Sequence, residues 1–535
     1  MSSSAWYTYL RPHRFPGTPA IFRLILAALS GAILSLSYRG SFPSIYAWFC
    51  VALLLASILG ARAWVAFLCG FLHGVIFVFT CVPWIADTLS IHGGMSRAAG
   101  WVILLLIAGV WGLSTGAFGW VVQRLSLRSY TLALAGAPFL WICTEVFRTY
   151  LPEISFPWGL LGYAPAENPG LVQLTTVTGI YGLSFLAAAF NALLLWSDCG
   201  PVSDRNRRLL VFGVVVVVLV LTMAIAPRFV PKAEANHRAR VVQPNFPENM
   251  EYSSDWFTVH KNDMAELGAL SLRLSLDNPQ PDLLIWPEAP APFSFQDAHF
   301  VPYISQLAND FHNPVIVGVV EWKPTTEQRP AGPRMTLVPY NSAVMLNGFG
   351  QRLFSYDKMH LVPFGEYEPF PLIHQVVTSV SEEVGGFHKG TVRAVGTFPN
   401  GYRFSLFICY EAIYPGEIRQ FTDRGAQLLI NISNDGWFGT SAAAEQHLRM
   451  ARVRAVENRR WLLRDTNSGL TASIDPYGNV TRVLRRDVRG SADLPYDFRS
   501  DRTVYVRAGE WFMWMCVVVS AILVVITFRK EKLAR

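Results

Sequence analysis

Long apolar runs separated by short polar connections fill the first 230 residues of the chain, and one further apolar run lies near its end. A helix needs about 20 mostly apolar residues to cross a bilayer. Runs close to that length predict eight transmembrane helices. They are Ile21–Ser37, Tyr46–Leu59, Ala63–Cys81, Ala98–Val122, Tyr130–Phe147, Val177–Trp196, Leu209–Ile225 and Trp511–Phe528.

The stretch between the seventh and eighth runs has a different pattern. Short apolar, β-branched runs such as Val315–Val320 and Phe404–Ile408 alternate with segments of helical periodicity such as Ser441–Asn458. Strands that alternate with helices indicate an α/β domain. We therefore expect an N-terminal membrane domain over 1–228, a water-soluble domain over 229–509, and a final transmembrane helix with a basic tail over 510–535.

The composition agrees with two regions in different solvents. Hydrophobic residues make up 52% of the 535 residues and charged residues only 16%, against about 25% charged residues in soluble proteins. The formal net charge is +7. Because many Lys and Arg residues lie beside apolar runs, where they orient membrane segments, we read this charge as a topology signal and not as nucleic-acid binding.

The distribution of positive charge predicts the orientation. With eight helices and the N-terminus inside, thirteen basic residues fall in inside segments and three in the short outside segments. The thirteen are Arg11, Arg14, Arg23, Arg62, Arg124, Arg128, Arg205, Arg207, Arg208, Arg529, Lys530, Lys532 and Arg535, and the three are Arg39, Arg97 and Arg148. This bias predicts cytoplasmic termini and places the soluble domain outside the cytoplasm.

One outside connection is rich in aromatic residues. The segment Phe156–Tyr163 contains Pro and Gly but no Lys or Arg, which is typical either of a segment lying at the membrane interface or of a simple aromatic anchor. Nearby, Glu145 and Arg148 are three residues apart at the end of the fifth run. They have the spacing of an ion pair on one helix face, and a substrate role is the alternative.

Three polar residues follow apolar strands of the soluble domain. Glu288 comes after Leu-Leu-Ile-Trp-Pro, Lys358 follows Tyr-Asp, and Cys409 ends Phe-Ser-Leu-Phe-Ile. Cys409 is the only one of the seven cysteines in 229–509, so that domain has no internal disulfide, and no Cys/His cluster with zinc spacing is present. Loops at strand ends are where α/β folds place their chemistry.

These three residue types together could perform covalent catalysis. A carboxylate can take the proton of a thiol, and an ammonium group can stabilise the oxyanion that forms when the sulfur attacks an ester carbonyl. Each residue also has a structural interpretation. Cys409 could be an inert core thiol, Glu288 a helix N-cap acid and Lys358 a solvated loop lysine.

Longer motifs around these residues resemble the nitrilase (carbon–nitrogen hydrolase) superfamily, and more narrowly its membrane branch, the apolipoprotein N-acyltransferases. The motifs are Trp286–Glu288, Lys358–Glu366, Ile408–Glu411, Asn434–Gly439, His447–Glu457 and Thr466–Gly469, together with Phe156–Trp158 and Gly162–Tyr163. The likeness covers nearly the whole chain.

The resemblance implies a four-layer α/β/β/α sandwich in the periplasm, attached to the inner membrane. It implies that Cys409 is the nucleophile, Glu288 the general base and Lys358 the oxyanion-stabilising residue, with Glu366, Tyr410 and Glu411 in support. The acyl donor would be a phospholipid, with phosphatidylethanolamine expected. The acceptor would be the α-amine of a diacylglyceryl-cysteine lipoprotein. No metal or other cofactor is implied.

The chain departs from the family pattern at Pro244, where Gly is frequent, at Gly436, where Ala is frequent, and at Tyr252, where Trp is usual. Tyr offers less stacking surface than Trp, so these positions concern how a substrate is held. Just after Glu366, five apolar residues suggest a loop that touches lipid and gates the pocket, with a buried packing loop as the alternative. They are Phe370, Leu372, Ile373, Val376 and Val377.

Two other functions remain open from the sequence. The same three residues would serve a membrane-tethered carbon–nitrogen hydrolase (amidase) that gives the thioester to water. A transporter, or a lipoprotein-binding module with an inactive domain, is the second alternative. Charged residues are few within the apolar runs, whereas transporters often use such residues.

Overall fold

The computed structural model describes residues 18–39, 44–91, 95–199, 202–247, 256–274, 280–288, 294–329, 332–363, 365–367 and 386–528. The chain forms two compact units. The first comprises residues 1–86, 101–230 and 510–535, and the second comprises residues 87–100 and 231–509. Each unit is described by itself below.

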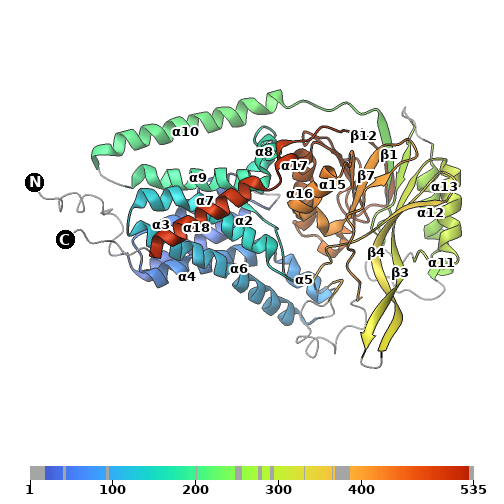
Figure 1. Cartoon of the computed structure of the whole chain (residues 1–535), viewed down its shortest axis with the longest axis horizontal. Coiled ribbons are helices and arrows are strands. Elements are labelled where there is room, and N and C mark those ends of the chain that lie inside the picture. The colour runs from blue at the N-terminus through green and yellow to red at the C-terminus, as the bar shows by residue number, and fades with distance from the viewer. Residues whose placement is uncertain are drawn as a thin grey trace, which may run out of the picture. The chain divides into compact units, whose positions relative to one another are not determined.

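The first unit is built of apolar helices (Figure 1). Its helices include α2 (Ala20–Leu36), α3 (Cys50–Ile58), α4 (Ala63–Cys81), α6 (Arg97–Ser126), α7 (Tyr130–Tyr150), α9 (Ile180–Asp198), α10 (Arg205–Ile225) and α18 (Trp511–Phe528). The last six of these helices are long and apolar enough to cross a membrane, α10 being counted through Phe229. The helix α2 and the segment Ser44–Ile58 are shorter apolar helices. A helical membrane domain is therefore present, and its first two expected crossings correspond to the shorter helices.

Small residues let α4 and α6 pack closely. A Cβ atom added at Gly70 would lie 2.0 Å from the Thr115 carbonyl oxygen, and one added at Gly119 would lie 2.3 Å from the Ala66 carbonyl oxygen. Such distances are possible only without a side chain. Helices in lipid associate through close packing at small residues rather than through the hydrophobic effect, so these glycines determine how near the two helices come.

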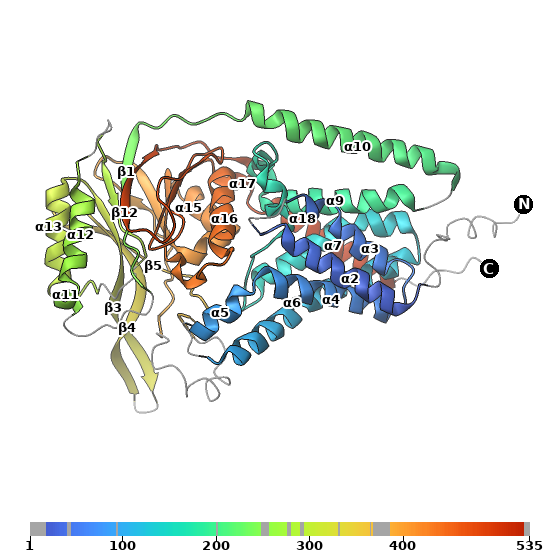
Figure 2. The ribbon, with the colours of Figure 1, turned by 180° about the vertical axis from the view of Figure 1, so that it is seen from behind.

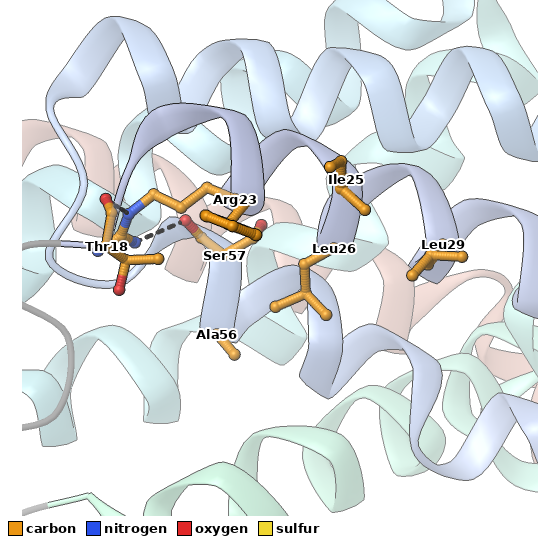
Figure 3. Close-up of a pocket in the computed structure, with 8 residues that line it drawn as sticks. Thr18, Arg23, Ile25, Leu26, Leu29, Ala56 and Ser57 are labelled. Atoms are coloured by element: carbon orange, nitrogen blue, oxygen red, sulfur yellow. Dashed lines mark hydrogen bonds between the residues drawn. The ribbon is translucent and has the colours of Figure 1, made fainter.

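A buried arginine joins α2 to the end of α3. Arg23 Nη1 donates hydrogen bonds to the carbonyl oxygens of Ser57, at 2.9 Å, and Leu59, at 2.8 Å. The last carbonyls of a helix lack partners within the helix, so Arg23 caps α3. Figure 3 shows Arg23 reaching Thr18 and Ser57 at one end of an apolar groove of about 300 Å³.

The aromatic segment Phe156–Tyr163 lies inside the first unit. The rings of Phe156 and Trp158 are buried and stack at 5.4 Å, and Trp111 continues the stack on Phe156 at 5.2 Å. This burial argues against a simple aromatic anchor, which would turn these rings toward lipid.

Glu145 and Arg148 hold this aromatic segment. Glu145 Oε1 accepts hydrogen bonds from Leu161 N at 2.7 Å and from Trp141 Nε1 at 3.1 Å. Arg148 Nη1 donates to the Trp158 carbonyl oxygen at 3.2 Å. The two charged side chains therefore bind the backbone of the segment, which satisfies polar groups that water cannot reach.

The second unit contains two six-stranded sheets. The first has the order β12 (Gly490–Tyr496), β1 (His237–Gln243), β2 (Leu283–Ile285), β3 (Val315–Arg329), β4 (Gly332–Leu346), β5 (Arg352–Asp357). The second has the order β11 (Val480–Thr481), β10 (Ala472–Ile474), β9 (Trp461–Thr466), β8 (Leu428–Ser433), β7 (Arg403–Ile408), β6 (Gly396–Thr397). At the centre of each sheet three strands run parallel, namely β1–β2–β3 and β7–β8–β9.

Helices cover the outer face of each sheet (Figure 2). The helices α12 (Lys261–Leu272) and α13 (Phe300–Phe311) lie on the first sheet, and their apolar faces join strand residues in one buried cluster. The helices α15 (Pro415–Asp423) and α16 (Ala443–Asn458) lie on the second sheet. Since the two sheets pack face to face, the predicted α/β/β/α sandwich is confirmed. The carboxyl ends of its parallel strands are the expected position for a site.

Candidate active site

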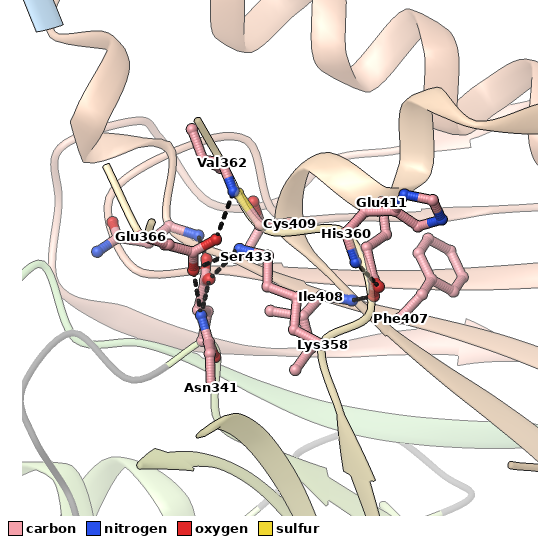
Figure 4. A network of polar contacts seen from close by, with 12 residues as sticks. Asn341, Lys358, His360, Val362, Glu366, Phe407, Ile408, Cys409, Glu411 and Ser433 are labelled. Carbon is pink, nitrogen blue, oxygen red and sulfur yellow. Dashed lines mark hydrogen bonds and ion pairs between the residues drawn. The ribbon is translucent and has the colours of Figure 1, made fainter. Parts of the chain in front are cut away.

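The three candidate residues follow three different strands. Glu288 lies shortly after β2, Lys358 directly after β5, and Cys409 directly after β7. All three are buried, with exposed fractions of 6%, 1% and 6%. Lys358 Nζ lies 2.9 Å from Glu288 Oε1, and both charges act on the Cys409 thiol. The structure therefore brings these sequence-predicted residues together, and Figure 4 shows Lys358 with Cys409.

Lys358 is held between two carboxylates. Its Nζ donates to Glu366 Oε1 at 2.8 Å as well as to Glu288, and Asn341 Nδ2 donates to the same two oxygens, each at 2.7 Å. Burial by itself would lower the pKa of Lys358, but the two carboxylates outweigh it and place that pKa well above its ordinary value. The ammonium group is therefore charged and fixed in position.

The remaining carboxylate oxygens bind backbone N–H groups. Glu288 Oε2 accepts from Asn434 N at 2.9 Å, and Glu366 Oε2 accepts from Val362 N at 2.8 Å. A carboxylate with both oxygens engaged cannot rotate without losing hydrogen bonds. The side chain of Glu288 is thus oriented from the second sheet, through Asn434, as well as by Lys358.

Glu411 links the Lys358 loop to the Cys409 turn. Its Oε1 accepts from Met359 N at 2.7 Å and from His360 N at 3.1 Å, and its Oε2 accepts from Ile408 N at 2.7 Å. Tyr356 donates its hydroxyl to both oxygens at 2.9 Å. Burial raises the pKa of Glu411, although His360 and the three N–H groups act against this. Glu411 therefore holds the backbone that follows Lys358 close to the backbone that precedes Cys409.

Cys409 has an unusual backbone and a protonated sulfur. Its φ of 51° lies in the left-handed region, which costs a residue other than Gly about 1–2 kcal/mol. Burial, followed by the charge of Glu288, raises the pKa of the Cys409 thiol to about 12, although Lys358 and a hydrogen bond with Ser433 lower it. The strain of a positive φ at a residue such as Cys409 persists only where surrounding contacts hold the backbone, and it is frequent at active sites.

Tyr410, the third expected supporting residue, forms a hydrogen bond with a neighbouring tyrosine. Its hydroxyl lies 2.6 Å from the Tyr414 hydroxyl, and the Tyr414 ring stacks on His360 at 4.2 Å. His360 Nε2 lies 3.3 Å from Glu417 Oε2. Tyr410 is therefore connected to the loop that carries Lys358 through Tyr414.

Several site residues carried no recognisable signal in the sequence. Asn341 bridges two carboxylates, yet it is a single polar residue inside β4. Asn431 contacts the Cys409 carbonyl oxygen from β8 and likewise stood in no motif. His447 contacts the same oxygen from α16; it begins the motif His447–Glu457 but had no assigned role. Within the described ranges, no three His, Cys, Asp or Glu side chains are grouped so that they could hold a metal ion.

Two of the three departures from the family pattern are described. The Pro244 carbonyl oxygen accepts a hydrogen bond from Arg489 Nε at 2.7 Å. Gly436 N donates to Asn434 Oδ1 at 3.2 Å, in the turn that presents Asn434 N to Glu288. Tyr252 and the five residues of the expected lipid-touching loop, at 370, 372, 373, 376 and 377, lie outside the described residues.

Comparison with protein families agrees with this geometry. Residues 30–193 match the model of the apolipoprotein N-acyltransferase N-terminal domain, and residues 238–492 match the carbon–nitrogen hydrolase model. A solved amidase of the nitrilase superfamily from Nesterenkonia aligns with 54% of this chain and 98% of its own. Its sequence identity is 18% and its TM-score 0.37.

Relatives match over nearly their full length. The apolipoprotein N-acyltransferase of Geobacter metallireducens is 31% identical, with 97% of this chain and 98% of the relative covered. That of Rhodopseudomonas palustris is 30% identical, with 95% of each chain covered, and that of Thermotoga maritima is 28% identical, with 94% and 93% covered. The resemblance expected from the motifs is confirmed: the chain belongs to the apolipoprotein N-acyltransferase family.

Proposed function

We propose that this membrane protein is an acyltransferase that moves a fatty acyl chain from a phospholipid, through a thioester on Cys409, to the N-terminal α-amine of a diacylglyceryl-cysteine lipoprotein. The observation that carries the proposal is the buried Glu288–Lys358 ion pair beside Cys409. It occurs in a chain that matches apolipoprotein N-acyltransferases from end to end.

In the first half-reaction Cys409 attacks the ester carbonyl of the phospholipid. Because the resting thiol is protonated, its proton passes to Glu288 as the sulfur–carbon bond forms. The oxyanion is stabilised by Lys358, which is already charged and immobile. The ester carbon–oxygen bond then breaks, Glu288 returns the proton to the leaving oxygen, and a lysophospholipid departs.

In the second half-reaction the α-amine of the lipoprotein attacks the thioester. Glu288 accepts a proton from the attacking nitrogen, and Lys358 again stabilises the oxyanion. The carbon–sulfur bond breaks, the amide forms, and the thiolate takes the proton back. Glu366 and Glu411 hold Lys358 and the Cys409 turn through the hydrogen bonds given above, which supports their role as positioning residues.

The donor head group and the cellular location are the finer parts of the proposal. We propose phosphatidylethanolamine as the donor and the inner membrane as the location, with the second unit in the periplasm. The orientation is supported by the thirteen basic residues counted in inside segments against three in outside segments. The donor can be tested with vesicles that contain phosphatidylethanolamine or phosphatidylglycerol as the only source of acyl chains.

Intact mass spectrometry tests the thioester directly. The purified protein, incubated with phospholipid, is expected to gain one acyl mass that hydroxylamine removes. Cys409→Ala should show no gain, and Cys516→Ala, which removes a buried cysteine of the first unit, should behave like the wild type. An acyl mass that survives hydroxylamine, or that appears in Cys409→Ala, would contradict the proposal.

The acceptor separates this function from the amidase alternative. When a diacylated lipopeptide is added to the acyl-enzyme, an acyltransferase produces the N-acylated lipopeptide, whereas a hydrolase releases free fatty acid at the same rate with or without the lipopeptide. Full-length likeness to apolipoprotein N-acyltransferases favours the first outcome.

A further inference from the structure

Two side chains converge on the backbone carbonyl oxygen of Cys409. Asn431 Nδ2 lies 3.3 Å from this oxygen and His447 Nε2 lies 3.1 Å from it. Asn431 belongs to β8 and His447 to α16, so the carbonyl is held from two elements. These contacts fix the peptide plane that follows Cys409, whose φ of 51° is strained.

A single buried arginine orients both donors. Arg464, in β9, donates from Nη1 to Asn431 Oδ1 and lies with Nη2 3.1 Å from His447 Nδ1. Arginine has no acceptor atom. The Asn431 atom that faces it must therefore be oxygen, and this turns the Asn431 amide N–H groups toward the carbonyl oxygens of Phe407 and Cys409.

The same reasoning fixes the tautomer of His447. The Cys409 carbonyl oxygen can only accept, so Nε2 of His447, which lies 3.1 Å away, must carry a ring proton. On the other side of the ring, Nδ1 lies 3.1 Å from Arg464 Nη2 and 3.3 Å from Asp435 Oδ1. Burial and the charge of Arg464 lower the pKa of His447, although Asp435 and the Cys409 carbonyl act against this. The fully buried ring is therefore neutral, and its one N–H, at Nε2, is committed to the Cys409 carbonyl oxygen.

Asp435 completes the cluster and supplies its negative charge. Its Oδ1 lies 2.6 Å from Arg464 Nη2 and accepts from the Ser433 hydroxyl at 3.1 Å, while Oδ2 accepts from Leu470 N at 3.3 Å. Burial would raise the pKa of Asp435, but Arg464 outweighs it and holds that pKa well below its ordinary value. Asp435 therefore neutralises the charge of the Arg464 guanidinium. The hydrogen bonds that define this cluster do not include Glu288 or Lys358.

We propose that Arg464, neutralised by Asp435, is the positioning residue that aims the nucleophile: it orients Asn431 and His447, which together hold the Cys409 carbonyl and with it the sulfur. This rests on the proposed function of Cys409. His447 is then a hydrogen-bond donor and not a proton carrier in the reaction. Glu288 performs the proton transfers of the proposed reaction, so no step requires His447 to exchange a proton.

Three substitutions separate positioning from general stabilisation. His447→Leu removes the donor, whereas His447→Gln places an amide N–H near the position of Nε2. Arg464→Lys keeps a positive charge opposite Asp435 but loses the planar fork that contacts two partners at once. Arg460→Lys is the matched control, because Arg460 is an equally buried arginine that donates to the carbonyl oxygens of Ala426 and Asp501 instead.

The first measurement is the rate of acyl-enzyme formation under single-turnover conditions, together with the KM for phospholipid and the pH profile. His447→Leu and Arg464→Lys are expected to lower the rate by about 10- to 100-fold at unchanged KM, as small misplacements of a reacting group do. His447→Gln should recover most of the rate with the wild-type pH profile. Arg460→Lys should lower only thermal stability.

Several results would overturn the proposal. Equal rates for His447→Leu and the wild type would exclude positioning through His447. Losses that match Arg460→Lys would leave only a structural role. A pH profile that loses one limb in His447→Gln would make His447 an acid–base catalyst.

A second measurement needs no lipid. Alkylation of Cys409 by a haloacetamide, located by peptide mapping, should become about threefold faster or more in His447→Leu, because a released cysteine no longer holds its sulfur in the buried position. An unchanged alkylation rate would contradict the positioning role even if the wild type formed no acyl-enzyme. Absence of the acyl-enzyme in the wild type would contradict only the proposed function.

Discussion

Cys409 combines its proposed nucleophilic role with a sulfur that is protonated at rest. A thiol whose pKa is raised to about 12 is almost entirely uncharged near neutral pH, and a protonated sulfur is a poor nucleophile. This arrangement is the opposite of a preformed thiolate. In the proposed reaction, the sulfur becomes nucleophilic only when a substrate carbonyl is in place and Glu288 removes the proton as the bond forms.

The resting state of this sulfur is testable by alkylation. Because the thiolate fraction rises about tenfold for each pH unit below the pKa, the rate of Cys409 alkylation should rise steadily between pH 7 and pH 10 without a plateau. Glu288→Gln removes the negative charge that helps to raise the pKa of Cys409, so its rate should be higher at each pH. Mass spectrometry of the peptide that contains Cys409 measures both. A plateau near pH 8 in the wild type would mean a preformed thiolate.

Asp465, next to Arg464 in β9, should make stability depend on pH. It is fully buried, and burial raises its pKa well above the ordinary value despite nearby N–H groups. The folded state then holds a proton that the unfolded state releases above about pH 4. Stability is therefore fully present below that pH and declines as the pH rises toward the raised pKa.

Asp465→Asn tests this dependence. Asparagine keeps the shape of the protonated acid but cannot ionise, so the variant should unfold at a higher temperature than the wild type at pH 7. The difference should shrink toward zero near pH 4. Each unit of pKa shift is worth about 1.4 kcal/mol. Thermal unfolding of the full chain in detergent between pH 4 and pH 8 measures the effect, and a difference independent of pH would contradict it.

At the level of single residues, motifs revealed the candidate catalytic residues and the carboxylates Glu366 and Glu411 that contact their surroundings, but not the buried amides. Glu288, Lys358 and Cys409 each belong to a sequence motif of several residues. Asn341, by contrast, is one amide in an otherwise ordinary strand, and it acts through partners 53 and 25 residues away in the chain. Local pattern reports local structure, so contacts across sheets leave no trace in it.

Among the elements, apolar periodicity predicted helices and central strands better than it predicted β9. That strand carries Arg464 and Asp465 side by side, fully buried. Because charged residues are almost never fully buried unless paired, a pattern search reads this pair as a surface turn. The pairing of Arg464 with Asp435, which makes its burial possible, becomes visible only in the folded sheet.

The close approach of α4 and α6 yields a prediction about the membrane helices. Gly70→Ala would place a methyl group 2.0 Å from the Thr115 carbonyl oxygen, so the helices must separate, and a loss of about 1–3 kcal/mol is expected, as for overpacked cores. Gly109→Ala is the matched control, because a Cβ atom there meets nothing within 4 Å. Thermal unfolding in detergent compares them, and equal unfolding temperatures would contradict the close packing.

At the scale of the whole molecule, residues 87–100 fall within the membrane domain expected over 1–228, yet they cluster with the second unit. There the Thr88 hydroxyl donates to the Trp437 carbonyl oxygen at 2.8 Å, two residues from Asp435 of the cluster that orients Cys409. A connector of ordinary length gives no hint of such a partner, because the partner lies 349 residues further along the chain.

The orientation proposed for the whole chain across the membrane rests on its charges and can be measured with two engineered cysteines. Asn400 is exposed in the second unit. Leu127, 65% exposed, lies in the connection between α6 and α7, beside Arg128 and shortly after Arg124 in the last turn of α6. A membrane-impermeant maleimide applied to cells with a permeable outer membrane should label Asn400→Cys. It should label Leu127→Cys only after the inner membrane is opened, since basic connections remain in the cytoplasm. The wild type provides the background, because six of its seven cysteines are buried. Labelling of Leu127→Cys in intact cells, with protection of Asn400→Cys, would contradict the proposed orientation. Cys409 would then lie on the opposite side of the membrane from acceptors on the outer face.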